Sequence, residues 1–278
     1  MCCIASYFAA STLAHPIWSY ATDASLNATR AYSLKAARCA ADPASNASPR
    51  ERDYLFALSV YANASGLAPA ERLRRHADAM RTVAERHASE DENAGVLYGL
   101  SLLAVGYYSE EEPSRQWPHL LAAAAAEEAV LARSPRHPGA LHLAIHAYDQ
   151  PALASRALGL ARRYAEVAGS VPHPIHMPSH IYSNLGLWSD VVAANVKSMN
   201  AALGRDKAAK GARAASLSSL TSAGVTAADA AAAASTSHQD WSHAAFFLQV
   251  GLLNLALDCH AEALARELQR CAPVDREL

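Results

Sequence analysis

Histidine is the residue type with the clearest chemical potential in this sequence, and its spacing is more informative than its number. His142, His146 and Asp149 follow one another at steps of four and three, which places them on one face of a helix. A second group with the same steps follows: His173, His176 and His180. Neutral imidazole is a ligand for Zn, Cu, Fe and Ni. The two groups therefore predict a site for a divalent transition metal ion.

The predicted ligands fall into a first choice and a set of further candidates. The first choice is His142, His146, His176 and His180. The further candidates, as additional ligands or as residues that hold the ligands in place, are His15, His137, Asp149, His173 and His243. With Asp149 included, the site resembles the two-histidine, one-carboxylate sites of non-haem iron, whereas ligation by histidine alone favours copper or zinc. The sequence leaves the choice between Cu, Fe and Zn open.

Prolines beside the histidines affect the expected geometry. Pro138 and Pro178 suit the first turn of a helix and bias the residue before them towards an extended conformation. We therefore expect His137 and His176 at helix entrances, where the ideal spacing of successive turns is not guaranteed. Aromatic residues near the histidines are predicted to line a pocket: Tyr148, Tyr182, Trp188 and Trp241.

Helices must position these side chains, because the composition is rich in Ala, Leu, Arg and Glu and contains only 12 Gly and 13 Pro. We predict an all-α fold without a large sheet. Capping residues, prolines and apolar periodicity predict these helices: 49–61, 71–87, 94–107, 120–132, 140–148, 151–168, 179–185 and 188–203. Short turns between them predict antiparallel neighbours.

The segment 181–188 places a small residue, Gly186, at a helix crossing and an aromatic residue, Trp188, just after it, as tetratricopeptide repeat (TPR) pairs do. Further units are expected at 246–268 and, in degenerate form, at 3–39. We predict one α-solenoid of divergent TPR-like pairs over residues 1–278. Residues 211–237 form a low-complexity Ala, Ser and Thr segment that suits a plain helix or a loose linker.

Two strings carry a resemblance to a known family: HPGALHLAIHAYD (137–149) and HMPSHIYSNLGLW (176–188). They resemble the signature segments of a mostly bacterial group of TPR-like proteins of unassigned function, and weaker similarity covers most of the chain. Members of that group also carry a late His-Asn-x-His-Phe element. Residues 242–247 align with it, so that His243 matches the first histidine and Phe246 replaces the second.

Bulk properties narrow the function. The formal net charge of -2, with basic residues spread along the chain, gives no reason to expect nucleic-acid binding. No apolar stretch reaches the roughly 18 to 20 residues of a membrane span, no basic region precedes the first apolar run, and the five cysteines show no CxxC pair. We therefore expect a soluble, cytoplasmic protein in a reducing compartment that neither binds nor crosses membranes.

Two functions stay open. In the first, a His-rich inner site binds the metal ion and supports an oxidoreductase or hydrolase that acts on a small molecule; its catalytic residues are unknown. In the second, a TPR scaffold binds a peptide or partner protein in its concave groove, and the histidines only pack and cap helices. Convergence of the imidazole nitrogens on a common point would favour the metal site.

Overall fold

The computed structural model describes residues 3–14, 21–64, 66–109, 113–216 and 243–256, together with residues 261, 262, 264 and 266. Helices make up 82% of the structure, and none of the described residues lies in a strand. This result confirms the predicted all-α class. None of the described helices combines the length and the apolar character that crossing a membrane requires.

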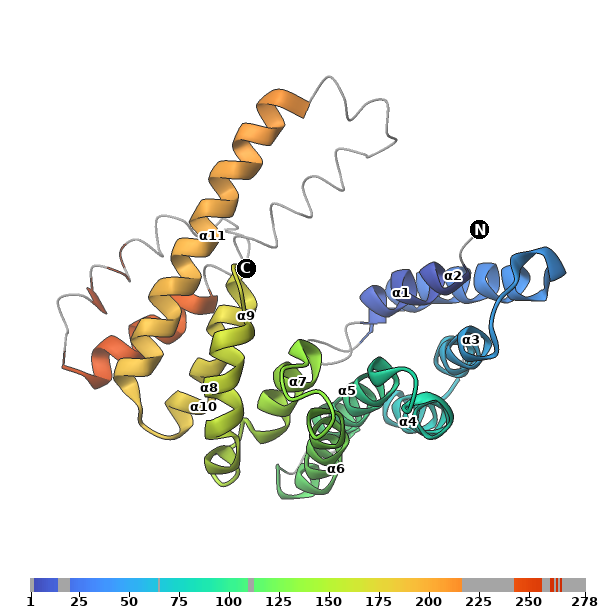
Figure 1. The fold of residues 1–278 in the computed structure, drawn as a ribbon, viewed down its shortest axis with the longest axis horizontal. Coiled ribbons are helices and arrows are strands. Elements are labelled where there is room, and N and C mark those ends of the chain that lie inside the picture. Colours follow the sequence, from blue (N-terminus) through green and yellow to red (C-terminus); the bar gives the residue numbers. More distant parts are fainter. Residues whose placement is uncertain are drawn as a thin grey trace. The chain divides into compact units, whose positions relative to one another are not determined.

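The chain divides into two compact units, Met1–Tyr148 and Asp149–Leu278, and each is described by itself. The first unit contains seven helices among its described residues: α1 (Cys3–Ala14), α2 (Asp23–Ala41), α3 (Pro49–Ala62), α4 (Pro69–His87), α5 (Glu92–Ser109), α6 (Pro113–Leu131) and α7 (Pro138–Tyr148). Each helix packs against the next along the chain, and α1 also contacts α3 as α5 contacts α7 (Figure 1). Whether the two units form one TPR-like solenoid stays a prediction.

Local signals explain why these helices begin where they do. Ser48 accepts a hydrogen bond from the backbone N–H of Glu51, and the Glu51 carboxylate accepts one from the N–H of Ser48, which forms a capping box at the start of α3. Proline occupies the first helical position of α3, α4 and α7, where its missing N–H costs nothing. These starts agree with the sequence prediction to within two residues.

Glycine residues of α5 allow side chains of α6 to approach its backbone closely. A Cβ atom built on Gly99 would lie 2.0 Å from Oε1 of Glu127, so the Glu127 carboxyl group fills the notch that glycine leaves. Glu127 is fully buried, and neither of its carboxyl oxygens has a hydrogen-bond partner in the described structure. Burial raises the pKa of Glu127 from 4.5 to about 9, so the group is a neutral acid at pH 7.

An ion-paired histidine joins α3 to the end of α4. His87 donates from Nε2 to Asp53 at 2.9 Å and from Nδ1 to Glu90 at 3.0 Å, and Arg86 donates to both oxygens of Asp53 at 3.2 Å. The hydrogen bond to Asp53 raises the pKa of His87. Burial alone would raise the pKa of Asp53, but the hydrogen bonds from His87 and Arg86 lower it. Both shifts favour the charged pair.

A disulfide that the sequence analysis did not predict joins Cys3 of α1 to Cys39 of α2. Its two cysteines are 36 positions apart. The bond therefore closes a loop of the chain that includes the connection between α1 and α2. Cys3 itself is buried among apolar residues of α1 and α3.

The second unit contains a short 3-10 helix, η2 (Ala154–Ala157), followed by α8 (Leu158–Val167), α9 (Pro172–His176), α10 (Pro178–Asn184) and α11 (Trp188–Ser216). The predicted helix 151–168 was therefore wrong at its start, since residues 151–157 form turns and η2. The predicted helix 188–203 was too short, because α11 continues to Ser216 and includes the first residues of the low-complexity segment. The rest of that segment, 217–237, lies outside the described residues.

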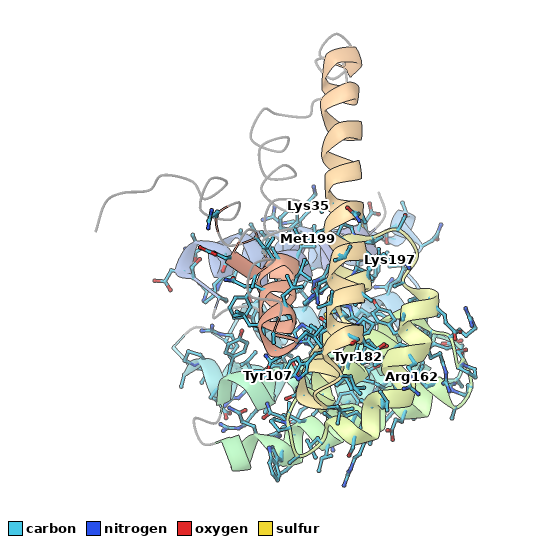
Figure 2. The ribbon with its side chains drawn as sticks, turned by 90° about the vertical axis from the view of Figure 1, so that its left-hand side faces the viewer. Lys35, Tyr107, Arg162, Tyr182, Lys197 and Met199 are labelled. Atoms are coloured by element: carbon cyan, nitrogen blue, oxygen red, sulfur yellow. A yellow bond between two sulfur atoms is a disulfide. The ribbon has the colours of Figure 1, made fainter. Side chains whose placement is uncertain are left out.

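A further helical stretch, residues 243–254, packs on α11. Leu248 and Leu252 of this stretch form an apolar cluster with Val192 and Met199 of α11, and Met199 is labelled beside it in Figure 2. A Cβ atom on Gly251 would lie 3.0 Å from Val192, so glycine permits the close approach. This packing carries His243, at the start of the stretch, to the α9–α10 region.

Candidate metal site

His176 and His180 form a pair across the junction of two short helices. His176 is the last residue of α9, Met177 has helical dihedral angles (φ -51°, ψ -39°) and Pro178 begins α10. The backbone therefore stays helical before the proline, and His176 lies at the end of a helix, so its predicted position at a helix entrance was wrong. The Nε2 atoms of His176 and His180, one turn apart, face each other at 2.9 Å.

An asparagine on α11 fixes the tautomer of His176. Asn195 is fully buried and donates from Nδ2 to the backbone oxygen of Val191 at 2.8 Å, so its Oδ1 must be the atom that faces His176. The distance from His176 Nδ1 to Asn195 Oδ1 is 2.6 Å. Because Oδ1 only accepts, His176 carries its proton on Nδ1, and its Nε2 has a free electron pair.

A carboxylate fixes the tautomer of His180. The distance from His180 Nδ1 to Oδ2 of Asp149 is 2.7 Å, and a carboxylate accepts that proton. Asn184 donates from Nδ2 to the other oxygen, Oδ1 of Asp149, at 2.7 Å and to the backbone oxygen of His180 at 3.0 Å. The Asp149 carboxylate and the His180 backbone oxygen can only accept hydrogen bonds, so the NH₂ group of Asn184 must face them. The electron pair of His180 Nε2 therefore also points towards His176.

The two Nε2 atoms thus present electron pairs to one another at 2.9 Å. In water-poor surroundings this arrangement is repulsive unless a cation, either a proton or a metal ion, lies against both atoms. Burial lowers the pKa of His176 well below its usual value, and the neighbouring imidazole of His180 lowers it further. Proton uptake by His176 is therefore disfavoured.

His243 completes a group of three nitrogens. One ring nitrogen from each of His176, His180 and His243 lies within 4.8 Å of the others. Burial also lowers the pKa of His243, so the neutral form that binds metals is favoured. The ring of Phe247 lies one turn beyond His243, with its centroid 4.8 Å from those of His176 and His180 and 5.4 Å from that of His243. Phe247 therefore gives the group an apolar wall.

Other residues of the predicted site lie elsewhere or take other roles. His142 and His146 lie on α7 in the first unit, with their Nε2 atoms 3.2 Å apart, and their predicted pairing with the histidines of the second unit stays a prediction. His137 accepts a hydrogen bond from the N–H of Ala140 at 3.2 Å and so caps α7. His173 lies on α9, with its ring centroid 6.2 Å from that of His176. Asp149 accepts a hydrogen bond from Nδ1 of His180, on the side of the ring away from Nε2, and its predicted role at the metal stays a prediction.

The predicted pocket aromatics are spread over both units. Tyr148 is buried in the first unit and donates to Glu128 at 2.7 Å, and Tyr182 is buried on α10. Trp188 begins α11. His15 and Trp241 lie outside the described residues.

Sequence analysis missed three residues that shape the group: Asn184, Asn195 and Phe247. Asn184 follows His180 by four positions and Phe247 follows His243 by four, so helical spacing could have indicated both. Asn195 is 19 positions from its partner, His176, and only its polarity within an apolar stretch of α11 could have indicated a buried role.

Comparisons with known proteins add no assignment: no family model, no curated protein and no solved structure matches this chain.

Proposed function

We propose that the second unit binds one divalent transition metal ion through His176, His180 and His243. The observation that carries this proposal is the pair of Nε2 electron pairs that face each other at 2.9 Å with both Nδ1 atoms already occupied. Two nitrogen ligands of a tetrahedral zinc ion, each about 2.0 to 2.1 Å from the metal, lie roughly 3.3 Å apart. To hold the ion, the rings of His176, His180 and His243 would have to turn until their nitrogens, now within 4.8 Å of one another, lie about that far apart.

The ligand chemistry favours zinc or copper. The proposed ligands are three neutral imidazoles, and Asp149 is engaged behind His180, so the two-histidine, one-carboxylate set of non-haem iron is not formed by these residues. Hydrogen bonds from ligating histidines to carboxylates and amide oxygens are usual around metal ions, since they hold the ring and raise its basicity. Asp149 and Asn195 fit those roles.

Three protein ligands leave a fourth position for water or a small molecule, as catalytic zinc sites do. An ion held by these neutral ligands would lower the pKa of bound water to near 7 and would polarise carbonyl or phosphoryl oxygens. We therefore propose a metal-dependent enzyme that acts on a small molecule, either as a hydrolase with zinc or as an oxidoreductase with copper and an external electron acceptor. His176, His180 and His243 would hold the ion, and Phe247 would keep bulk water from one side.

A scaffold that binds a peptide or partner protein is the second candidate, and the observation that favours it is His137. That residue caps α7 through Nδ1, which is the kind of structural role the scaffold interpretation assigns to every histidine. The same interpretation requires a proton between the Nε2 atoms of His176 and His180, and burial disfavours that proton on His176.

Elemental analysis of untagged protein, with thermal melting in the presence and absence of a chelator, tests the proposal. We expect about one metal ion per chain, and stability that rises by about 2.7 kcal/mol at a metal concentration a hundred times the dissociation constant. His180→Ala should remove the ion and the effect of the chelator. His119→Ala, a matched change on α6 outside both histidine groups, should leave both unchanged.

Metal-free wild-type protein whose melting temperature ignores both zinc and chelator would overturn the metal site and leave the scaffold. The same measurements on His142→Ala test the sequence prediction that the first unit contributes to the same ion. Unchanged metal content in that variant would restrict the site to the second unit.

A further inference from the structure

We infer that Asn184 and Asp149 together select the tautomer of His180 and thereby make its Nε2 a metal ligand. The inference rests on the proposed metal site and extends it to two positioning residues that need not touch the ion. Asn184 sets the direction of the hydrogen bonds that run from Asn184 through Asp149 to His180, since it donates to Asp149 and to the backbone of His180 at once.

The contacts have a direction that can be followed atom by atom. Asn184 Nδ2 donates to Asp149 Oδ1, and Asp149 Oδ2 accepts the proton from His180 Nδ1. In a neutral imidazole only one ring nitrogen carries hydrogen, so a proton held on Nδ1 leaves Nε2 free to bind a metal. His180 Nε2 is the atom that faces His176 at 2.9 Å. The direction of the first hydrogen bond thus sets the state of the last nitrogen.

This direction makes an unusual prediction for Asp149→Asn. An amide has one accepting and one donating end, and Asn184 can only donate at this position because its NH₂ group is held by the His180 backbone oxygen. The new amide must therefore turn its oxygen to Asn184 and its NH₂ group to His180 Nδ1. His180 would then accept at Nδ1 and carry its proton on Nε2. That proton points at His176 Nε2, where it forms a hydrogen bond in place of the metal ion.

Exchanging the two residues should reverse the effect. In the double variant Asp149→Asn with Asn184→Asp, the new carboxylate accepts from the new amide, whose oxygen then faces His180 Nδ1. The ring returns to the tautomer with hydrogen on Nδ1. The carboxylate at position 184 also meets the backbone oxygen of His180, so the recovery should be partial.

Two measurements test the inference, and the first needs no metal. Nitrogen-15 NMR of the metal-free protein at about pH 8, above the usual imidazole pKa, distinguishes protonated from unprotonated ring nitrogens. We expect the His180 proton on Nδ1 in the wild type, on Nε2 in Asp149→Asn and on Nδ1 again in the double variant. Zinc titration by calorimetry should show a loss of affinity of about 10 to 100-fold in Asp149→Asn. The double variant should lose less than the product of the two single losses.

Asp190→Asn is the matched control, because it removes one acidic charge from an exposed position at the start of α11 in the same unit. It should leave the tautomer of His180 unchanged, and it should change the zinc affinity by no more than twofold. A proton that stays on Nδ1 in Asp149→Asn, or single losses that simply multiply in the double variant, would overturn the inference. Wild-type protein that binds no zinc would overturn the proposed function instead. The tautomers would still show whether Asn184 and Asp149 set the protonated nitrogen of His180.

Discussion

Replacing the buried acid Glu127 with its neutral isostere should stabilise the first unit at neutral pH. Glu127 is fully buried against Gly99, both of its oxygens lack partners, and burial raises its pKa to about 9. At pH 7 the folded protein therefore holds a proton that the unfolded chain, with the ordinary value of 4.5, has released. Glu127→Gln keeps the shape of the side chain and removes this difference in proton binding.

The sign and size of the effect follow from the two pKa values. Because the folded state binds the extra proton, the wild-type free energy of unfolding falls as pH rises from 4.5 towards 9. At about 1.36 kcal/mol for each pH unit, the loss between pH 4.5 and pH 7 is about 3 kcal/mol. Glu127→Gln avoids this loss and should melt roughly 6 to 12 °C higher than the wild type at pH 7, by the usual scaling for a chain region of this size.

Thermal melting followed by circular dichroism at pH 4.5 and pH 7 measures the effect. The two proteins should melt together at the lower pH and separate at the higher one. A wild type and variant with the same difference at both pH values would refute the buried neutral acid. Gly99→Ala provides the steric counterpart: its Cβ would lie 2.0 Å from Glu127 Oε1, so overpacking should cost at least about 1 to 3 kcal/mol.

Three further changes in the first unit have expected outcomes. Cys39→Ser, or reduction of its disulfide with Cys3, should lower the free energy of unfolding by about 4 kcal/mol in the chain-entropy model for a 36-residue loop, as measured by urea titration with and without reductant. His87→Gln should lower the free energy of unfolding most below the unfolded pKa of about 6.5. The stability difference between wild type and variant should vanish as pH rises through the raised folded pKa of His87. Urea midpoints from pH 6 to 9 measure this difference, and a constant value would contradict the charged pair with Asp53. Ser48→Ala removes a side-chain cap and should cost about 1 kcal/mol at any pH in the same titrations, whereas no change would deny the cap a role in stability.

Local chemistry explains why so much of the helical layout could be predicted. The start of α3 was predicted from Ser48, Pro49 and Glu51 because a capping box depends on residues three positions apart. The region after Tyr148 was predicted poorly, since residues 151–157 have good helix-forming composition but form turns and η2. Propensity is a weak signal over so short a stretch, and tertiary packing, such as the contact of η2 with α10, can override it.

The candidate site shows the same division between local and distant information. The spacing of His176 and His180 predicted that they share a face, and they do so although Pro178 biases the residue before it away from the helix. The orientation of their rings depends on Asn195 and Asp149, which come from other segments. Periodicity within one helix contains no information on such partners, so the sequence could indicate ligand types but not tautomers.

The site also depends on tertiary structure for its third nitrogen. His176 and His180 come from one continuous helical path over residues 172–184. His243 arrives only because Leu248, Gly251 and Leu252 seat the stretch 243–254 on α11. Asn195, which orients His176, also lies on α11. The helix that aligns one ligand therefore positions another, and a metal ion bound by all three would stabilise the same packing that assembles its site.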